Sequence, residues 1–241
     1  MRKKALLFNY KLQGKQFIHF LHIGKTGGSA IRNSLSNNFK SVISKKNVYK
    51  LNENIIFLHN HSFKIRNVPK GEKIVFFLRD PVSRFVSGFY SRKRKDQPLY
   101  NYKWRPEEKI AFSHFNTPNQ LAIALSSDDE NERTIAQNAM NGISHVNMQF
   151  SFWIESETYL MSRRADILFI GFQETLTQDF KILKSKLNLP DKVKLPEDDL
   201  QSHRSLKGED KTLEDRAVEN IKDWYSDDYK ILSLCKHIMK L

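Results

Sequence analysis

The sequence of 241 residues predicts a single α/β domain, in which a mainly parallel sheet is flanked by helices and the turn after the first strand is P-loop-like. Three observations predict this fold class. Apolar runs at 17–23, 73–78 and 166–171 have the composition of strands buried on both faces, as in parallel sheets. The first two runs are followed at once by signals that start a helix. The chain is long enough for one large core, and nothing in the sequence indicates a second.

The stretch from Phe17 to Leu35 predicts a strand, a tight turn and a helix. After the apolar run, helical spacing resumes with Ile31 and Leu35. Glycines let several backbone N–H groups converge on one concavity, which also faces the positive end of the following helix. The lysine of this turn adds a positive charge, so the turn is expected to bind phosphate. It precedes the paired glycines, whereas the lysine of the common nucleotide loop follows the glycine. The turn consists of Gly24-Lys25-Thr26-Gly27-Gly28-Ser29.

The next segments predict a loop and a second strand that ends on two histidines. Residues 37–54 are polar and rich in lysine, which predicts a loop with a short strand around 42–43. Residues 54–58 are apolar and β-branched, as in a strand, and His59 and His61 follow them. Alternate strand residues share a face, so the two histidines could form half of a metal site. No Cys, His or acidic pair nearby in the sequence completes a ligand set, so we expect no metal.

A second anion-binding signal follows the apolar run at 74–78. Asp80 predicts a helix N-cap and Pro81 the first helical position. Arg79 is therefore expected at the carboxyl end of a strand, where open α/β sheets bind ligands. Ser87 comes eight residues later, about two helical turns along, and is expected to reach the same ligand. The planar fork of arginine makes paired hydrogen bonds to phosphate oxygens, which favours a phosphate ligand.

The remainder of the chain predicts mostly helices. Segment 92–105 is basic and carries aromatic residues, for which two interpretations stand equal: a loop that contacts an anionic or sugar-ring acceptor, or a solvated loop. Residues 106–165 have helical patterns, with a helix start at Thr117. A further helix is expected after the strand at 166–171, and residues 212–241 predict a helical end.

The net charge of +13 is distributed unevenly. Residues 1–105 hold 23 Lys+Arg against 4 Asp+Glu, or +19, whereas residues 106–241 hold 17 against 23, or −6. Anion binding is therefore expected in the first half. The same asymmetry occurs in nucleic-acid-binding proteins, so that class stays open, although the basic half has no zinc-finger, RNP or basic-zipper pattern.

Cysteine content and the N-terminal sequence indicate the compartment. The single Cys235 excludes an internal disulfide framework and fits a reducing environment. The apolar part of the N-terminus, residues 5–8, is too short for a signal peptide, and no run reaches the length of a membrane span. We therefore expect a cytoplasmic protein without a transmembrane segment.

Residues 22–29, His-Ile-Gly-Lys-Thr-Gly-Gly-Ser, resemble the 5′-phosphosulfate loop of sulfotransferases that use PAPS (3′-phosphoadenosine 5′-phosphosulfate). The likeness is to the branch with heparan sulfate 2-O- and 6-O-sulfotransferases, whose loop is His-Ile-Pro-Lys-Thr-Gly-Gly-Thr/Ser, and Gly24 departs from it. His61 matches the family's catalytic base, with His59 as its companion. Arg79 and Ser87 match the pair that grips the 3′-phosphate of PAPS.

This resemblance implies a sulfotransferase that needs no metal and moves a sulfuryl group from PAPS to a hydroxyl of a carbohydrate or glycolipid. The basic surface permits an anionic acceptor. His61 would remove the acceptor proton, and Lys25 would stabilise charge on the leaving phosphate. Region 92–165 would form the acceptor side. The implied cofactor contacts are Lys25, Thr26, Gly27, Gly28, Ser29, Ala30, Arg79, Ser87, Arg204 and Ser205.

Two other classes stay open from the residues alone. A P-loop kinase or nucleotide hydrolase shares the strand, loop and helix but requires a metal ion, for which Asp80 is the candidate ligand. A nucleic-acid-binding module is favoured only by the basic half. Its affinity would fall steeply with salt and would not depend on Lys25.

Overall fold

The computed structural model describes residues 2–43, 46–196 and 208–240. The chain forms two compact units. The sheet unit comprises Met1–Leu78, Ser151–His203 and Leu234–Leu241, and the helical unit comprises Arg79–Phe150 and Arg204–Ser233. Arg204 and Ser205, two of the expected cofactor contacts, lie outside the described residues.

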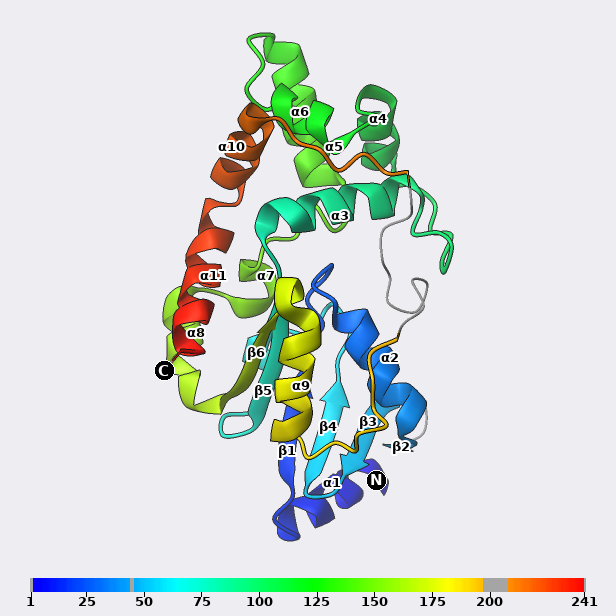
Figure 1. The fold of residues 1–241 in the computed structure, drawn as a ribbon, viewed down its shortest axis with the longest axis vertical. Helices are drawn as coiled ribbons and strands as arrows, with labels where there is room; N and C mark the ends of the chain where they lie inside the picture. Colours follow the sequence, from blue (N-terminus) through cyan, green and yellow to red (C-terminus); the bar gives the residue numbers. More distant parts are fainter. Residues whose placement is uncertain (1, 44–45, 197–207, 241) are drawn as a thin grey trace. The chain divides into compact units, whose positions relative to one another are not determined.

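The sheet unit is built on a six-stranded sheet with the order β2-β3-β4-β1-β5-β6 (Figure 1). β1 runs parallel to β4 and to β5, and β5 runs parallel to β6. β3 pairs antiparallel with β4 and with β2. The mainly parallel sheet is therefore confirmed. The strands are β1 Gln16–Phe20, β2 Ser41–Ile43, β3 Lys46–Leu51, β4 Asn54–Leu58, β5 Lys73–Leu78 and β6 Ile167–Phe172.

The loop predicted for 37–54 is wrong in its second half, where β3 forms. Val48, Tyr49 and Leu51 are buried in this strand although its overall composition is polar. Asn52 adopts a left-handed φ of 50° and closes a tight connection to β4, whose backbone supplies the pairing partners. Pairing with a buried neighbour outweighs the weak intrinsic signal, as is common for strands.

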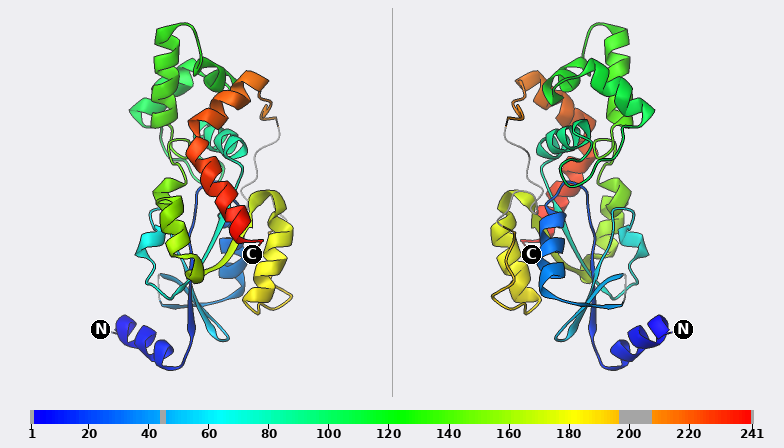
Figure 2. Two further views of the ribbon diagram at one scale, coloured as in Figure 1. Left: turned by 90° about the vertical axis from the view of Figure 1, so that its left-hand side faces the viewer. Right: turned by 90° about the vertical axis from the view of Figure 1, so that its right-hand side faces the viewer.

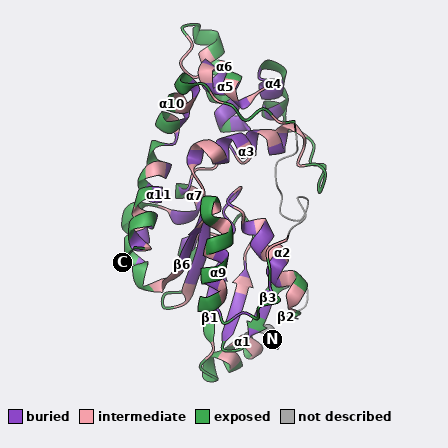
Figure 3. Ribbon diagram, in the orientation of Figure 1, coloured by how far each residue is buried: buried purple, intermediate pink, exposed green. Residues whose placement is uncertain are grey.

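Helices α2 (Gly28–Asn38) and α9 (Leu176–Lys186) lie on the same side of the sheet (Figure 2). They pack on the inward side chains of the central strands. Figure 3 colours most of the ribbon of these strands as buried. α9 confirms the helix expected after residues 166–171, and its Phe180 and Leu183 are buried. The shared core consists mainly of Ile18, Phe20, Ile31, Leu35, Ile56, Val75, Phe77, Phe169, Phe180 and Leu183.

The N-terminal segment, for which no helix is predicted above, forms helix α1 (Arg2–Leu12). Leu7 and Tyr10 pack against a smaller cluster made by Phe17, Val48 and Ile55. The remaining short elements of the sheet unit are α7 Ser151–Ile154, α8 Glu157–Ser162, η1 Ile65–Asn67, η2 Arg164–Asp166 and η3 Gln173–Thr175.

The helical unit has an apolar core of its own, to which every helix of the unit except α11 contributes. The predicted helix starts are confirmed: the Asp80 carboxylate accepts the Ser83 N–H at 2.9 Å, with Pro81 at the first helical position, and the Thr117 hydroxyl accepts the Gln120 N–H. Helix α11 belongs to the helical unit up to Ser233. The helices are α3 Pro81–Lys93, α4 Pro106–His114, α5 Pro118–Ala124, α6 Glu130–Gly142, α10 Asp215–Trp224 and α11 Ser226–Ile238.

None of the helices in the described ranges combines the length and apolar character needed to cross a membrane.

Candidate functional site

The turn between β1 and α2 has the backbone of an anion-binding loop. Lys25 adopts a left-handed φ of 65° and Gly27, the N-cap of α2, a φ of 85°. A left-handed conformation costs a lysine roughly 1–2 kcal/mol, and such strained residues cluster at functional sites. The Thr26 hydroxyl donates to the Ile23 carbonyl at 3.0 Å, and the Ala30 N–H donates to the Gly27 carbonyl at 3.1 Å. These bonds stabilise the bend that brings Lys25 to the start of α2.

The positive end of α2 carries no acidic residue in its first turn, and its N-cap, Gly27, has no side-chain capping hydrogen bond. Unsatisfied N–H groups and the helix dipole favour an anion at such an end. Lys25, the closest lysine in sequence to this helix start, is half-buried. Phosphate binding at this helix start stays a prediction, which the absence of acidic residues in the first turn favours.

The paired glycines are required by close packing. A Cβ on Gly28 would lie 2.7 Å from Cδ2 of His22, a separation that real side chains do not tolerate. A Cβ on Gly27 would lie 3.1 Å from Cδ2 of Leu176, and its positive φ already disfavours a side chain. The His22 ring is thus pressed against the first turn of α2, and its Nε2 lies 3.5 Å from Oγ of Ser29.

His61, the predicted base, is anchored to this loop. Its Nδ1 donates to the carbonyl oxygen of His22 at 3.0 Å, and the two rings lie 3.9 Å apart between centroids. The indole Nε1 of Trp153 donates to the His61 carbonyl at 2.7 Å. Because a carbonyl can only accept, Nδ1 carries the proton of neutral His61 and Nε2 holds the lone pair. The side chain is therefore in the tautomer that can accept a proton at Nε2.

His59, the predicted companion, does not hydrogen-bond to His61 through its Nε2. That nitrogen lies 2.8 Å from Nδ1 of His19 on β1. The Arg32 guanidinium donates to the His59 carbonyl at 2.6 Å and to the Leu58 carbonyl at 3.2 Å. Burial lowers the pKa of His59 to about 3, and the neighbouring His19 and Arg32 add to this effect. His59 is therefore neutral near pH 7.

In the helical unit, Arg79 follows the last residue of β5 in the chain and Ser87 lies within α3. Both are half-buried. Asp80, between β5 and α3, accepts the Ser83 N–H on Oδ1 and the Tyr229 hydroxyl on Oδ2 at 2.8 Å. Its carboxylate thus serves the cap of α3.

Arg84, also on α3, is buried against an acid. Its guanidinium lies 3.4 Å from the Asp228 carboxylate and 5.0 Å from the Phe150 ring centroid. Burial raises the pKa of Asp228 to about 6, against the opposing effect of Arg84. Arg84 therefore belongs to the buried interior of the helical unit.

The basic aromatic segment 92–105 is ordered by a buried ion network. Arg92 pairs with Glu108 at 2.7 Å and also with Asp96, and Trp104 Nε1 donates to the Arg92 carbonyl at 2.7 Å. On this scaffold Tyr100 and Tyr102 stack with centroids 5.2 Å apart, although they are 49% and 58% exposed. The segment therefore presents two aromatic rings to solvent on a scaffold fixed by buried charges.

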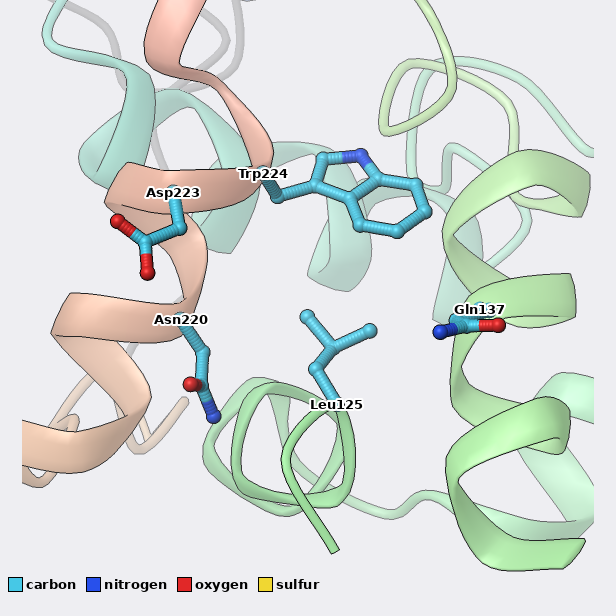
Figure 4. A pocket seen from close by; sticks show the side chains of 5 residues that line it. All are labelled: Leu125, Gln137, Asn220, Asp223 and Trp224. Carbon is cyan, nitrogen blue, oxygen red and sulfur yellow. The ribbon is translucent and has the colours of Figure 1, made fainter. Parts of the chain in front are cut away.

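A pocket of about 320 Å³ lies in the helical unit (Figure 4). It is lined by Leu125, Gln137, Asn220, Asp223 and Trp224. Of the described residues predicted for the site, none lines it. Cys235 is buried in the sheet unit, and burial raises the pKa of its thiol, which agrees with a packing role.

No group of three or more His, Cys, Asp or Glu side chains suited to a metal ion occurs within residues 2–43, 46–196 and 208–240. Sequence reasoning missed several residues around the histidine segment. His59 hydrogen-bonds to His19, which hydrogen-bonds to Glu72. Arg32 donates to the His59 carbonyl and Trp153 to the His61 carbonyl. Their partners are distant in sequence, so no local pattern marked them.

Comparison with known proteins gave one positive result. The model of a family described as "Sulfotransferase family" matches residues 8–234, which run through both units. A search of curated protein sequences found no match.

Proposed function

The chain belongs to the sulfotransferase family, and on this premise we propose that it transfers a sulfuryl group from PAPS to a hydroxyl of a carbohydrate or glycolipid acceptor. The single observation that carries the proposal is the hydrogen bond from Nδ1 of His61 to the carbonyl of His22. It ties the proposed base to the loop proposed to hold the phosphosulfate, within one unit. It also leaves the lone pair on Nε2, as a base requires.

The residues present fit PAPS. The start of α2 lies next to Lys25 in the sequence and has no acidic residue in its first turn, which suits the 5′-phosphosulfate. The proposed P-loop-like turn that would hold this group comprises residues 22–30. Arg79 and Ser87 suit a 3′-phosphate through charge and hydrogen bonding. When bound, PAPS supplies the activated sulfuryl group. We assign the cofactor contacts to Lys25, Thr26, Gly27, Gly28, Ser29, Ala30, Arg79 and Ser87, together with Arg204 and Ser205 outside the described residues.

In this mechanism His61 accepts the proton of the acceptor hydroxyl at Nε2. Lys25 stabilises the negative charge that develops on the leaving phosphate oxygen, and such placed charges are usually the largest catalytic contribution. His59 assists as the neutral neighbour of His61, adding no positive charge that would oppose proton uptake. No step of this scheme uses a metal.

The acceptor side is proposed to lie in region 92–165. The exposed Tyr100 and Tyr102 offer a face for a sugar ring, and the surrounding lysines and arginines allow an anionic glycan. Cys235, the single cysteine, is free and buried, which fits a protein of a reducing compartment. We propose that this compartment is the cytoplasm. The kinase alternative requires Asp80 as a metal ligand and is less well supported. Both carboxylate oxygens of Asp80 already accept hydrogen bonds, from the Ser83 N–H and from the Tyr229 hydroxyl.

The test is thermal unfolding with PAP, the desulfated product, compared with ATP, GTP and AMP, each with and without magnesium. Ligand at about a hundred times its dissociation constant adds about 2.7 kcal/mol to the free energy of unfolding. For a chain of this size the midpoint should rise by several degrees. We expect this rise with PAP, independent of magnesium.

Lys25→Ala should reduce the shift with PAP, whereas the exposed Lys70→Ala, in the same unit, should leave it unchanged. A shift with ATP and magnesium, together with none for PAP, would favour a kinase or nucleotide hydrolase instead.

A further inference from the structure

Three side chains form a continuous hydrogen-bonded chain inside the sheet unit. Oε2 of Glu72, just before β5, lies 2.7 Å from Nε2 of His19 on β1. Nδ1 of His19 lies 2.8 Å from Nε2 of His59, which follows β4. The other oxygen of Glu72, Oε1, pairs with Lys11 of α1 at 2.6 Å. Because β1 lies between β4 and β5, the chain crosses three adjacent strands.

The chemistry of the groups gives the chain one direction. A carboxylate only accepts, so His19 carries its proton on Nε2. Neutral His19 then accepts on Nδ1, which requires that His59 donates from Nε2. His59 is thereby held with its lone pair on Nδ1. At the other end of Glu72, the ammonium of Lys11 can only donate, which agrees with the same assignment.

Both histidines are neutral at physiological pH. Burial lowers the pKa of His19, a residue that is 5% exposed, and Lys11 and Arg163 act in the same sense, while Glu72 opposes them. Burial likewise lowers the pKa of His59, with His19 and Arg32 adding to it. A doubly protonated His19, which would reverse the chain, is therefore disfavoured.

Each histidine ring is also held by stacking on an aromatic ring. His59 stacks on Phe63 with centroids 3.4 Å apart and an interplanar angle of 5°, and His19 stacks on Phe57 at 4.7 Å and 4°. An apolar pair at positions 19 and 59 would fill the same space and bury no polar group. Burying a polar group costs about 1–3 kcal/mol when its hydrogen bonds are left incomplete. Packing by itself therefore gives no reason for two histidines and a glutamate here.

We propose that Glu72 and His19 are positioning residues that hold His59 in the tautomer with Nδ1 as the proton acceptor, so that His59 can assist catalysis beside His61. This inference rests on the proposed sulfuryl transfer for its catalytic part. The tautomer itself is a property of the protein without ligand. Only Asn60 separates His59 from His61, so the orientation of one constrains the backbone of the other.

Glu72→Gln tests the direction of the chain with almost no change in shape. The amide oxygen will face Lys11, which can only donate, and the amide NH2 will then face Nε2 of His19. His19 must accept there and donate from Nδ1, so His59 must accept on Nε2 and carry its proton on Nδ1. The chain of hydrogen bonds survives, but every proton in it moves to the other nitrogen.

The measurement is a multiple-bond ¹H–¹⁵N NMR spectrum of the histidine rings at pH 7, which distinguishes protonated from unprotonated ring nitrogens. Wild-type His59 should show a protonated Nε2, and Glu72→Gln should show a protonated Nδ1. Glu53→Gln, an exposed glutamate of the same unit paired with Lys15, should leave the spectrum of His59 unchanged. A wild-type His59 protonated on Nδ1, or one unaltered by Glu72→Gln, overturns the proposal.

The catalytic part is measured as turnover of PAPS, with heparosan, an unsulfated anionic glycan, and with water as acceptors. Glu72→Gln should lower kcat by about 10²-fold, the lower range for a group that assists proton transfer and is held in the wrong tautomer, and leave the thermal shift with PAP unchanged. An inverted tautomer with wild-type kcat overturns the positioning role. Absence of PAP binding and turnover in the wild type contradicts the proposed function, and the spectrum still decides the tautomer.

His19→Phe provides a second variant that keeps the stacking on Phe57 and removes both hydrogen bonds. Its His59 should show a mixture of tautomers and titrate nearer the ordinary histidine pKa. If His59 stays entirely protonated on Nε2 in this variant, the hydrogen bond to His19 does not fix its tautomer and the proposal is wrong. His114→Phe, at an exposed position of α4, is the matched control and should leave His59 unaltered.

Discussion

At the scale of single residues, the site depends on which nitrogen of each histidine carries the proton. The backbone carbonyl of His22 determines this for His61, and the carboxylate of Glu72 determines it for His59 through His19. Neither assignment requires a charged histidine. A neutral imidazole with a defined lone pair can accept a proton near neutral pH without a preceding tautomer exchange.

His61→Ala should abolish sulfuryl transfer while sparing cofactor binding, because the side chain holds the proposed base and no proposed PAPS contact. We expect kcat to fall by at least about 10²-fold, the lower range for general base catalysis. The thermal shift with PAP should stay as in the wild type. If the shift with PAP disappears as well, His61 supports the loop and its role as base is wrong.

At the scale of elements, the strand, turn and helix from β1 to α2 form the central part of the proposed site. Gly27 and Gly28 let the turn approach Leu176 and His22 closely, and His22 in turn contacts His61. The start of α2 and the proposed base are therefore coupled by packing. A substitution at the start of α2 that displaces the His22 ring should therefore also displace His61.

Gly28→Ala should displace the His22 ring, since the added Cβ would lie 2.7 Å from its Cδ2. We expect a loss of about 1–3 kcal/mol in the free energy of unfolding, as for other overpacked sites. Turnover should fall more steeply than PAP binding. Urea unfolding and kcat are the measurements, and Asn37→Ala, exposed on the same helix, is the control. Wild-type stability and turnover in Gly28→Ala would contradict this coupling.

At the scale of the whole molecule, two buried groups make the stability depend on pH with opposite sign. The pKa of His59 is lowered to about 3, so its contribution is present above about pH 6.5 and is lost as the pH falls toward 3. The pKa of Asp228 is raised to about 6. The folded protein binds that proton first, so the contribution of Asp228 increases as the pH falls from about 6 to 4.

His59→Phe should therefore flatten the loss of stability on the acid side. Between pH 6.5 and 4, the wild type should lose at most about 1.4 kcal/mol per pH unit more than the variant, the value for one proton. Urea unfolding at a series of pH values measures this difference. His114→Phe should retain the wild-type slope, and an equal slope in His59→Phe would show that His59 titrates normally in the folded protein.

Much of the fold and the loop half of the site follow from local sequence. The apolar runs became β1, β4, β5 and β6, and Asp80 and Thr117 cap helices where expected. The polar composition of β3 concealed a strand that forms only because β4 lies beside it. The chain from Glu72 to His59 was not predictable, because its bonds join residues 53 and 40 positions apart.

By itself, the sequence determined the features that depend on neighbouring residues: the turn at Lys25 and Gly27, the start of α2, the cap of α3 and the family of the chain. Backbone preferences of glycine and proline and the hydrogen bonds of caps act over a few residues. Only the tertiary structure decided that His61 bonds to His22, and that His59 bonds to His19. Those partners meet because the sheet places β4 beside β1, and strand order arises from long-range packing that no short segment encodes.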